Sequence, residues 1–171
     1  GHPGQPIGEN HGKGGPRGYD GAKRLSGRKR HLLVDTGGLV LKAVVHPANV
    51  SDRDGAGLVL AAITTRFPRL THLWVDAGYT GAAVRRVTQD EGLSLQVVHR
   101  PRRWFRVPAD QDPPPMPTGF QVLPRRWVVE RTFAWLGRSR RLSKDYEELP
   151  ATEEAWIYLA MSMLMLARLA K

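Results

Sequence analysis

Short runs of strand-forming residues alternate with helix-periodic stretches along most of this chain, and this alternation limits the folds that it can adopt. Two such runs, 28–35 and 39–45, are joined by Thr36-Gly37-Gly38 and predict a β-hairpin that ends near Pro47. Further along, the pattern predicts helices at 56–65, 82–91 and 125–140 and strands at 70–75 and 93–98. Gly92 is expected to stop the helix at 82–91. A last, buried helix is expected to be capped by Thr152. The expected fold class is therefore α/β, with helices packed on a mixed sheet.

The domain organisation follows from composition. Segment 1–27 is rich in glycine and proline and then basic, which predicts a flexible arm before one domain at 28–171. Residues 101–124 hold seven of the 13 prolines and are expected to form an irregular connection. Neither a signal-peptide pattern nor a stretch of about 20 apolar residues is present, so we expect a soluble, cytoplasmic protein without membrane contacts.

The chain is strongly basic. It has 26 Lys and Arg against 16 Asp and Glu, a formal net charge of +10. Such a charge attracts polyanions and favours nucleic acid as a partner, although acidic small molecules or an anionic membrane surface would also fit. Since there is no cysteine, disulfides and thiolate metal sites are excluded.

Two carboxylates are candidates for chemistry. Asp76 ends an apolar strand, where α/β sheets usually bind ligands, but an aspartate before Gly78 is also typical of a turn. Glu130 lies on an arginine-rich helix, where it is either a metal ligand or part of a solvated face with intrahelical ion pairs. Two oxygen ligands on separate elements suit Mg²⁺ or Mn²⁺ better than zinc.

Other polar and aromatic residues favour structural roles. His31 and His46 lie in predicted strands, Asp35 belongs to the Gly37-Gly38 turn, and Asp52 and Asp54 are expected to cap a helix. No zinc-binding histidine spacing, nucleophile elbow or phosphate-binding loop is present. Aromatic residues at helical spacing, Trp127 and Trp135, would stack on bases or, more commonly, join the core.

Four sequence blocks occur together in a specific order. They are GGPRGYDGAKRLSGRKRHLLVDTGGLVL, VVHPANVSDRDGA, LWVDAGYTG and VVERTFAWLGRSRRLSKDYE. From about Gly14 to Lys171 the chain resembles the catalytic, C-terminal part of bacterial insertion-sequence DDE transposases, in particular the IS5-type group of the IS4/IS5 superfamily. The resemblance implies an RNase H-like mixed sheet flanked by helices, DNA transposition, and a two-metal Mg²⁺ (or Mn²⁺) site held by three carboxylates.

The resemblance assigns roles to individual residues. The second aspartate of the family matches Asp76, and the glutamate matches Glu130, so both would be catalytic metal ligands. The family also has an arginine four residues before the glutamate and a basic residue seven after it. Here Arg126 has the right spacing, whereas Gly137 occupies the later position, Arg138 follows it, and Leu123 replaces a frequent tyrosine. The residues expected to hold the DNA backbone are Arg126, Arg131, Arg138 and Arg141.

The first aspartate of the family has no counterpart. It belongs to a first strand before GGPRGYD, but no aspartate precedes Asp20, Glu9 is the only earlier acid, and 1–10 does not resemble a strand. We therefore expect an RNase H-like sheet that lacks its first strand, and a truncated, frame-shifted or split reading frame that is inactive alone. An N-terminal fragment would complement it, or the chain would form a homo-oligomer.

Three functions remain open from sequence. The first is a transposase enzyme that acts on insertion-sequence ends and target DNA, and is nucleoid-associated when bound. The second is a catalytically dead DNA-binding remnant that associates with DNA or with intact transposase. The third, supported by charge alone, is an RNA-related role of an RNase H-like protein.

Overall fold

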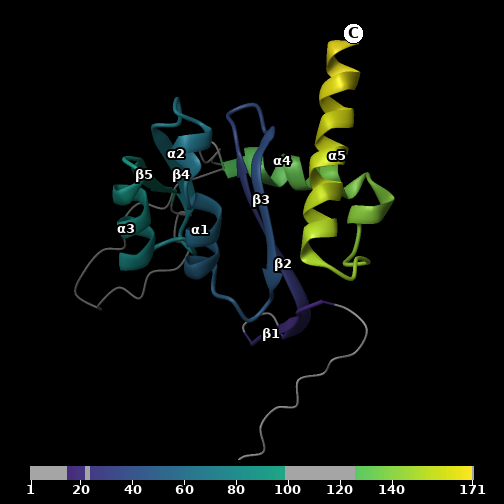
Figure 1. Cartoon of the computed structure of the whole chain (residues 1–171), viewed down its shortest axis with the longest axis horizontal. Helices are drawn as coiled ribbons and strands as arrows, with labels where there is room; N and C mark the ends of the chain where they lie inside the picture. Colours follow the sequence, from purple (N-terminus) through teal and green to yellow (C-terminus); the bar gives the residue numbers. More distant parts are fainter. Residues whose placement is uncertain (1–14, 22–23, 99–125, 171) are drawn as a thin grey trace, which may run out of the picture.

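The computed structural model describes residues 15–21, 24–98 and 126–170 of the chain (Figure 1). In chain order its elements are β1 (Gly18–Asp20), β2 (Leu25–Val34), β3 (Val40–Pro47), α1 (Asp52–Leu60), α2 (Ile63–Arg66), β4 (His72–Asp76), α3 (Ala82–Asp90), β5 (Ser94–Val98), α4 (Arg126–Gly137), the 3-10 helix η1 (Arg140–Leu142) and α5 (Pro150–Leu169). The predicted α/β class is confirmed, and the predicted connection at 101–124 lies outside the described residues.

The described strands form two small sheets rather than one mixed sheet. β1, β2 and β3 are antiparallel in that order, and β4 and β5 form a separate parallel pair. The predicted hairpin is confirmed, with Arg28 opposite Pro47 and Val34 opposite Val40. At its turn, Oδ1 of Asp35 accepts hydrogen bonds of 2.8 Å from the amides of Gly37 and Leu39, which confirms the turn role of Asp35.

Strand structure extends into the segment predicted as a flexible arm. β1 pairs with the first residues of β2, with Gly18 opposite Gly27 and Asp20 opposite Leu25. The boundary at residue 27 itself stays a prediction.

The predicted helix 56–65 is wrong in its extent, because the structure contains two helices there. α1 begins at Asp52, and its N-cap is Ser51, whose Oγ accepts a hydrogen bond from the Asp54 amide at 3.2 Å. Asp52 and Asp54 therefore lie in the first turn and do not cap the helix.

A residue distant in sequence explains the break between α1 and α2. Ala62 has a left-handed φ of 53°, and the carboxylate of Glu91 accepts hydrogen bonds from the amides of Ala62 (2.8 Å) and Thr64 (2.9 Å). These bonds satisfy the amides at the start of α2 and lower the pKa of Glu91. A helical pattern in the sequence does not reveal a cap that comes from after α3.

The last helix differs from prediction in two respects. It begins at Pro150, with Leu149 rather than Thr152 as its N-cap, because proline is well suited to the first turn. Its expected burial holds only for one face: Ile157 and Met161 are buried, while Leu159 and Leu166 are 49% and 66% exposed. Its C-terminal half extends beyond the other labelled elements (Figure 1) and exposes apolar side chains, among them Met163 and Leu169.

Within the described ranges, none of the helices combines the length and the apolar character needed to cross a membrane.

Two hydrophobic clusters hold the described elements together. One joins β3 to α4, η1 and α5 through Ala43, Val45, Leu136, Leu142, Ile157 and Met161. The other joins α1 and α2 to β4 through Leu60, Ile63, Leu73 and Leu93. Neighbouring residues of β2 serve different clusters, since Leu32 packs on the first and Leu33 on the second. Alternate side chains of a strand point to opposite faces, so α1 and α5 cover opposite faces of the hairpin.

Buried ion pairs fix the start of α5 against β2. The carboxylate of Glu153, which is 2% exposed, pairs with the guanidinium groups of Arg30 and Arg28. Arg30 also donates a 2.7 Å hydrogen bond to the Leu142 carbonyl, and Arg28 pairs with Asp145. Removing one partner from such a network leaves a buried charge without compensation.

Candidate active site

Asp76 is the last residue of β4 and also begins a turn. Its Oδ1 accepts a 2.8 Å hydrogen bond from the Gly78 amide, and its carbonyl accepts one of 3.1 Å from the Tyr79 amide. The carboxylate is nevertheless exposed, because the turn places it at the C-terminal end of a parallel strand. The turn interpretation and the binding-site interpretation of Asp76 are therefore compatible.

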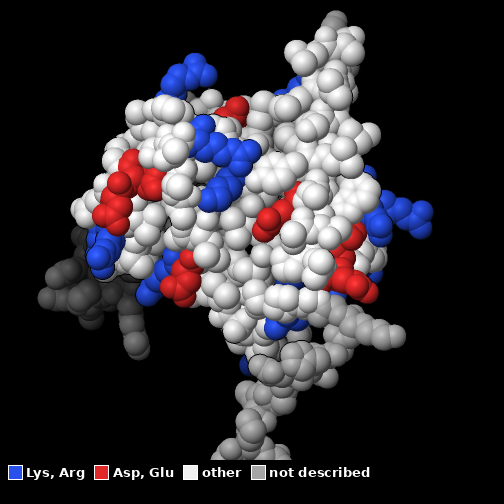
Figure 2. Space-filling model, viewed as in Figure 1, with Lys and Arg blue, Asp and Glu red and all other residues white. Residues whose placement is uncertain are grey.

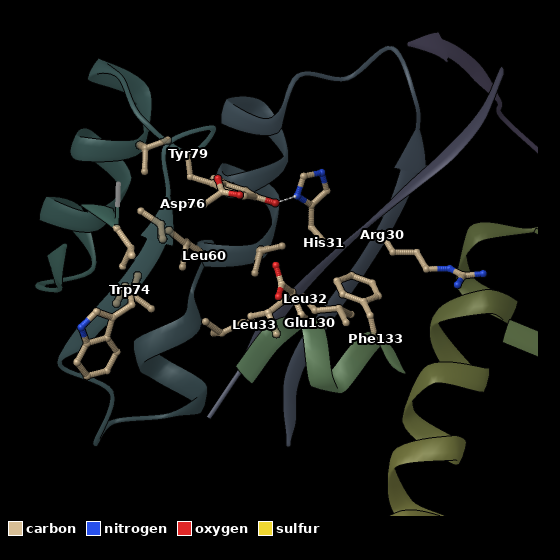
Figure 3. A pocket seen from close by; sticks show the side chains of 17 residues that line it. Arg30, His31, Leu32, Leu33, Leu60, Trp74, Asp76, Tyr79, Glu130 and Phe133 are labelled. Carbon is tan, nitrogen blue, oxygen red and sulfur yellow. Dashed lines mark hydrogen bonds between the residues drawn. The ribbon is translucent and has the colours of Figure 1, made fainter. Parts of the chain in front are cut away.

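The structure brings Asp76 and Glu130 into the same pocket. This pocket has a volume of about 210 Å³ and is lined by residues of β2, α1, β4 and α4 (Figure 3). Asp76 lies at the end of β4, and the Glu130 side chain points into the pocket from α4. These two residues are 54 positions apart, so only the packing of α4 against β2 and β4 brings them together.

His31 and Tyr79 form a further part of the pocket wall that the sequence did not indicate. The Tyr79 hydroxyl oxygen and Nδ1 of His31 are 2.6 Å apart and hydrogen bonded. The pKa of the Tyr79 phenol is raised, first by burial and then by the nearby carboxylates of Asp52 and Asp76. The phenol therefore stays neutral.

Both histidines with predicted structural roles are buried. His31 and His46 are 3% and 5% exposed, and their rings stack with centroids 4.6 Å apart and an interplanar angle of 19°. Gly55 of α1 lies against the same ring: a β carbon at this position would be 2.6 Å from Nε2 of His31. His31 thus connects α1, β3 and the loop after Asp76, and it also lines the pocket.

More carboxylates lie near Asp76 than the sequence motifs indicated. A wider hollow of about 660 Å³ shares Asp76 and Tyr79 with the pocket and is also lined by Asp20, Lys29 and Asp52. Nζ of Lys29 is 3.1 Å from Asp20 and 3.6 Å from Asp52. Because Lys29 neutralises part of this charge, Asp52 and Asp20 act as an ion-pair group beside the pocket.

The arginines predicted to bind DNA have different surroundings. Arg131 donates a 2.8 Å hydrogen bond to the Gly37 carbonyl, so it holds the hairpin turn against α4. Arg141 lies 3.6 Å from Glu147 and is 57% exposed, and Arg138 is exposed. Arg126 is the first residue of α4. A role for these four residues in DNA binding stays a prediction.

The two tryptophans of α4 sandwich an arginine. The guanidinium carbon of Arg131 is 4.3 Å from the ring centroid of Trp127 and 4.6 Å from that of Trp135. Trp127 is 47% exposed, so the prediction that it belongs to the core is wrong. On the face shown in Figure 2, basic side chains form small groups between acidic ones and make no continuous basic surface.

The donor atoms of the pocket suit a hard divalent cation. Asp76 and Glu130 both offer carboxylate oxygens, the ligands that Mg²⁺ and Mn²⁺ prefer. Among residues 15–21, 24–98 and 126–170, no group of three or more histidines, cysteines and acidic residues is close enough to hold a metal ion. Asp76 and Glu130 are the acidic residues among the described residues that line the pocket.

The sequence of this chain is similar to known proteins. A family model described as Transposase DDE domain matches residues 2–165. The chain is also 28% identical, over 161 residues, to a Burkholderia cepacia protein named as a transposase for insertion sequence element IS402, and the aligned region covers 89% of this chain and 68% of that protein. No solved structure matches. The family match spans nearly the whole chain, and the chain belongs to the family of transposase DDE domains.

Proposed function

We propose that this chain is the catalytic part of an IS5-type transposase, which cleaves phosphodiester bonds of DNA and joins strands with the help of Mg²⁺ or Mn²⁺. The observation that carries the proposal is the shared pocket of Asp76 and Glu130, the two residues that the motifs single out as metal ligands. The family match and the likeness to the IS402 protein support DNA as the substrate.

Asp76 and Glu130 would hold the metal ions, which activate the attacking hydroxyl and stabilise the leaving oxygen of a phosphodiester. The Gly78 amide orients the Asp76 carboxylate through its 2.8 Å hydrogen bond. The bond between Tyr79 and His31 fixes the loop that follows Asp76, so the carboxylate keeps its position beside the pocket. Arg126, Arg131, Arg138 and Arg141 would contact the phosphate backbone.

The 171 residues by themselves would bind DNA without cutting it. The resemblance implies three carboxylates, whereas the acidic residues among the described residues that line the pocket are Asp76 and Glu130. A fragment that supplies the third would restore activity, as would assembly with a complete transposase. The second function, a DNA-binding remnant of a transposase, rests on the formal net charge of +10, which attracts the phosphate backbone.

DNA cleavage and DNA binding by the purified chain test these functions together. The substrate is a plasmid that carries insertion-sequence ends, incubated with Mg²⁺ or Mn²⁺, and the variants are Asp76→Asn and Glu130→Gln. Asp90→Asn serves as the control, because Asp90 is an exposed carboxylate at the end of α3 and does not line the pocket. We expect salt-dependent DNA binding by all four proteins and cleavage by none of them.

Each result has a definite meaning. Suppose that the unaltered chain cleaves DNA, and that cleavage is lost in Asp76→Asn and Glu130→Gln but kept in Asp90→Asn. This result would establish a working site and disprove the inactive remnant. Absence of any salt-dependent DNA binding would contradict both functions.

A further inference from the structure

Two neighbouring residues of α1 reach the loop that follows Asp76. A β carbon at Gly78 would lie 3.1 Å from Oδ1 of Asp76 and 3.4 Å from Oδ2 of Asp52, so both carboxylates border this glycine. A β carbon at Gly81 would meet the side chain of Arg53, with Cδ at 3.5 Å, Nε at 3.7 Å and Cζ at 4.0 Å. The guanidinium of Arg53 therefore lies against the same loop as the candidate metal ligand.

Arg53 is close enough to Asp76 for one DNA strand to contact both. Gly78 and Gly81 are three positions apart in the sequence, so their Cα atoms are separated by at most about 11 Å. Phosphates recur about every 3.4 Å of helix axis along one strand of DNA. A strand with one phosphate at Asp76 can therefore place a second phosphate, up to about three nucleotides away, beside Arg53.

Two basic residues beside the candidate site are held by acidic ones. Among the described residues, Arg30 is the basic residue that lines the pocket, and its guanidinium pairs with Glu153. In the wider hollow, Nζ of Lys29 lies 3.1 Å from Asp20 and 3.6 Å from Asp52. The charges of these two cations are offset by their partners, so they attract a phosphate only weakly.

Arg53 has different surroundings. It is exposed, and no acidic side chain within residues 15–21, 24–98 and 126–170 pairs with its guanidinium. Its stem packs along Gly81, which holds the side chain over the loop and leaves N–H donors for a ligand. A planar guanidinium with available donors matches the oxygens of a phosphate.

We propose that Arg53 is a positioning residue, which binds a DNA phosphate close to the one at Asp76 and Glu130. The inference rests on the proposed function, because the metal ligands define where the first phosphate lies. Arg53 would orient the strand and offset the repulsion between its phosphates and the carboxylates of Asp52 and Asp76. The arginines expected from sequence to hold DNA lie on α4 and η1, so Arg53 adds a contact from α1.

Binding to a short DNA duplex that carries an insertion-sequence end tests this role. Fluorescence anisotropy at several salt concentrations compares the unaltered 171-residue chain with Arg53→Ala, Arg53→Lys and Arg69→Ala. Arg69 is a matched control, because it is also exposed but precedes β4, whereas Asp76 ends this strand. Both alanine variants remove one positive charge, so a general effect of net charge would be equal in the two.

Arg53→Ala should bind the duplex up to about eightfold more weakly at about 0.1 M salt, and the slope of log K against log salt should fall by about 0.9, as for one phosphate contact. Arg53→Lys should keep the slope, because the charge remains, with an affinity between those of the alanine variant and the unaltered chain. Arg69→Ala should change the affinity by less than about twofold. The urea midpoints of all four proteins should agree, since both arginines are exposed.

A cross-link locates the contact. The chain has no cysteine, so Arg53→Cys, Asp76→Cys and Arg69→Cys each introduce a single thiol. An activated disulfide is attached to successive phosphates of one DNA strand, and the rate of exchange with the thiol is measured for each position. We expect Arg53→Cys and Asp76→Cys to react at phosphates within about three nucleotides of each other, and Arg69→Cys to react more slowly at all of them.

Three results would overturn the inference: equal effects of Arg53→Ala and Arg69→Ala, a slope in Arg53→Lys as low as in Arg53→Ala, or equal cross-linking of Arg53→Cys and Arg69→Cys. Failure of the unaltered chain to bind the duplex would overturn the proposed function as well. Binding by Arg53→Ala with the slope of the unaltered chain contradicts only the role of Arg53.

Discussion

The hydroxyl oxygen of Tyr79 lies 2.6 Å from Nδ1 of His31, and this hydrogen bond joins the loop after Asp76 to β2. The two sheets share no strand pairing among the described residues, so contacts of this kind hold the Asp76 side of the pocket against the hairpin. His31 in turn stacks on His46 and lies against Gly55. The position of Asp76 therefore depends on the His46 side chain of β3 and on the backbone of α1 at Gly55.

Replacing Tyr79 by phenylalanine should lower the free energy of unfolding by about 1 kcal/mol, because one buried hydrogen bond is lost while the ring remains. Urea denaturation measures this difference. Tyr19→Phe is the control, since Tyr19 is 59% exposed and its substitution should change stability by less than about 0.5 kcal/mol. Equal stabilities of the two variants would show that the Tyr79 hydroxyl contributes nothing.

The contribution of Tyr79 should also depend on pH. Its pKa is raised in the folded chain, so folding favours the neutral phenol. The resulting stability is fully present below the unfolded-state pKa of about 10 and is lost as pH rises above it. The difference in unfolding free energy between the unaltered chain and Tyr79→Phe should shrink above about pH 10. A difference that stays constant through this range would contradict the shift.

Two glycines of α1 should respond oppositely to alanine. A β carbon at Gly55 would lie 2.6 Å from Nε2 of His31, so Gly55→Ala should lower the unfolding free energy by about 1–3 kcal/mol. A β carbon at Gly57 meets nothing within 4 Å, and Gly57→Ala should raise that free energy by about 0.5–1 kcal/mol through helix propensity. Thermal and urea unfolding would check both, and stabilisation by Gly55→Ala would disprove the close contact.

Glu153→Ala should be the most destabilising of these substitutions, at about 3–5 kcal/mol, because it leaves Arg28 and Arg30 without their buried partner. Glu148 is an exposed neighbour, and Glu148→Ala should change stability by less than about 0.5 kcal/mol. Chemical denaturation of both variants provides the comparison. A loss below about 1 kcal/mol for Glu153→Ala would mean that solvent reaches this network.

Substitutions of Arg138 and Arg131, two of the arginines expected to hold the DNA backbone, should have different effects. Arg138→Ala should weaken DNA binding and reduce the salt dependence of the binding constant by about one charge, without loss of stability. Arg131→Ala should lower stability by about 1–3 kcal/mol, since Arg131 bonds to the Gly37 carbonyl and stacks on both tryptophans. Binding titrations at several salt concentrations would separate the effects, with Arg85→Ala on α3 as the control.

Local sequence signals predicted most of the individual elements. The Gly37-Gly38 turn between two β-rich runs predicted the hairpin, and Gly92, with a φ of +66°, ends the α3 region as expected. Such signals depend on residues that are close together in the chain, so they can be recognised in the sequence. The division at Ala62 was missed, because the cap that causes it comes from Glu91.

The candidate site also combines features that local sequence predicts with features that depend on packing. The sequence by itself determined which carboxylates to consider, Asp76 after a strand and Glu130 on an arginine-rich helix, because motif and spacing are local properties. Only the tertiary structure decided that both line one pocket and that Tyr79 and His31 complete its wall. Those relations arise from packing between elements up to about a hundred residues apart, which periodicity does not encode.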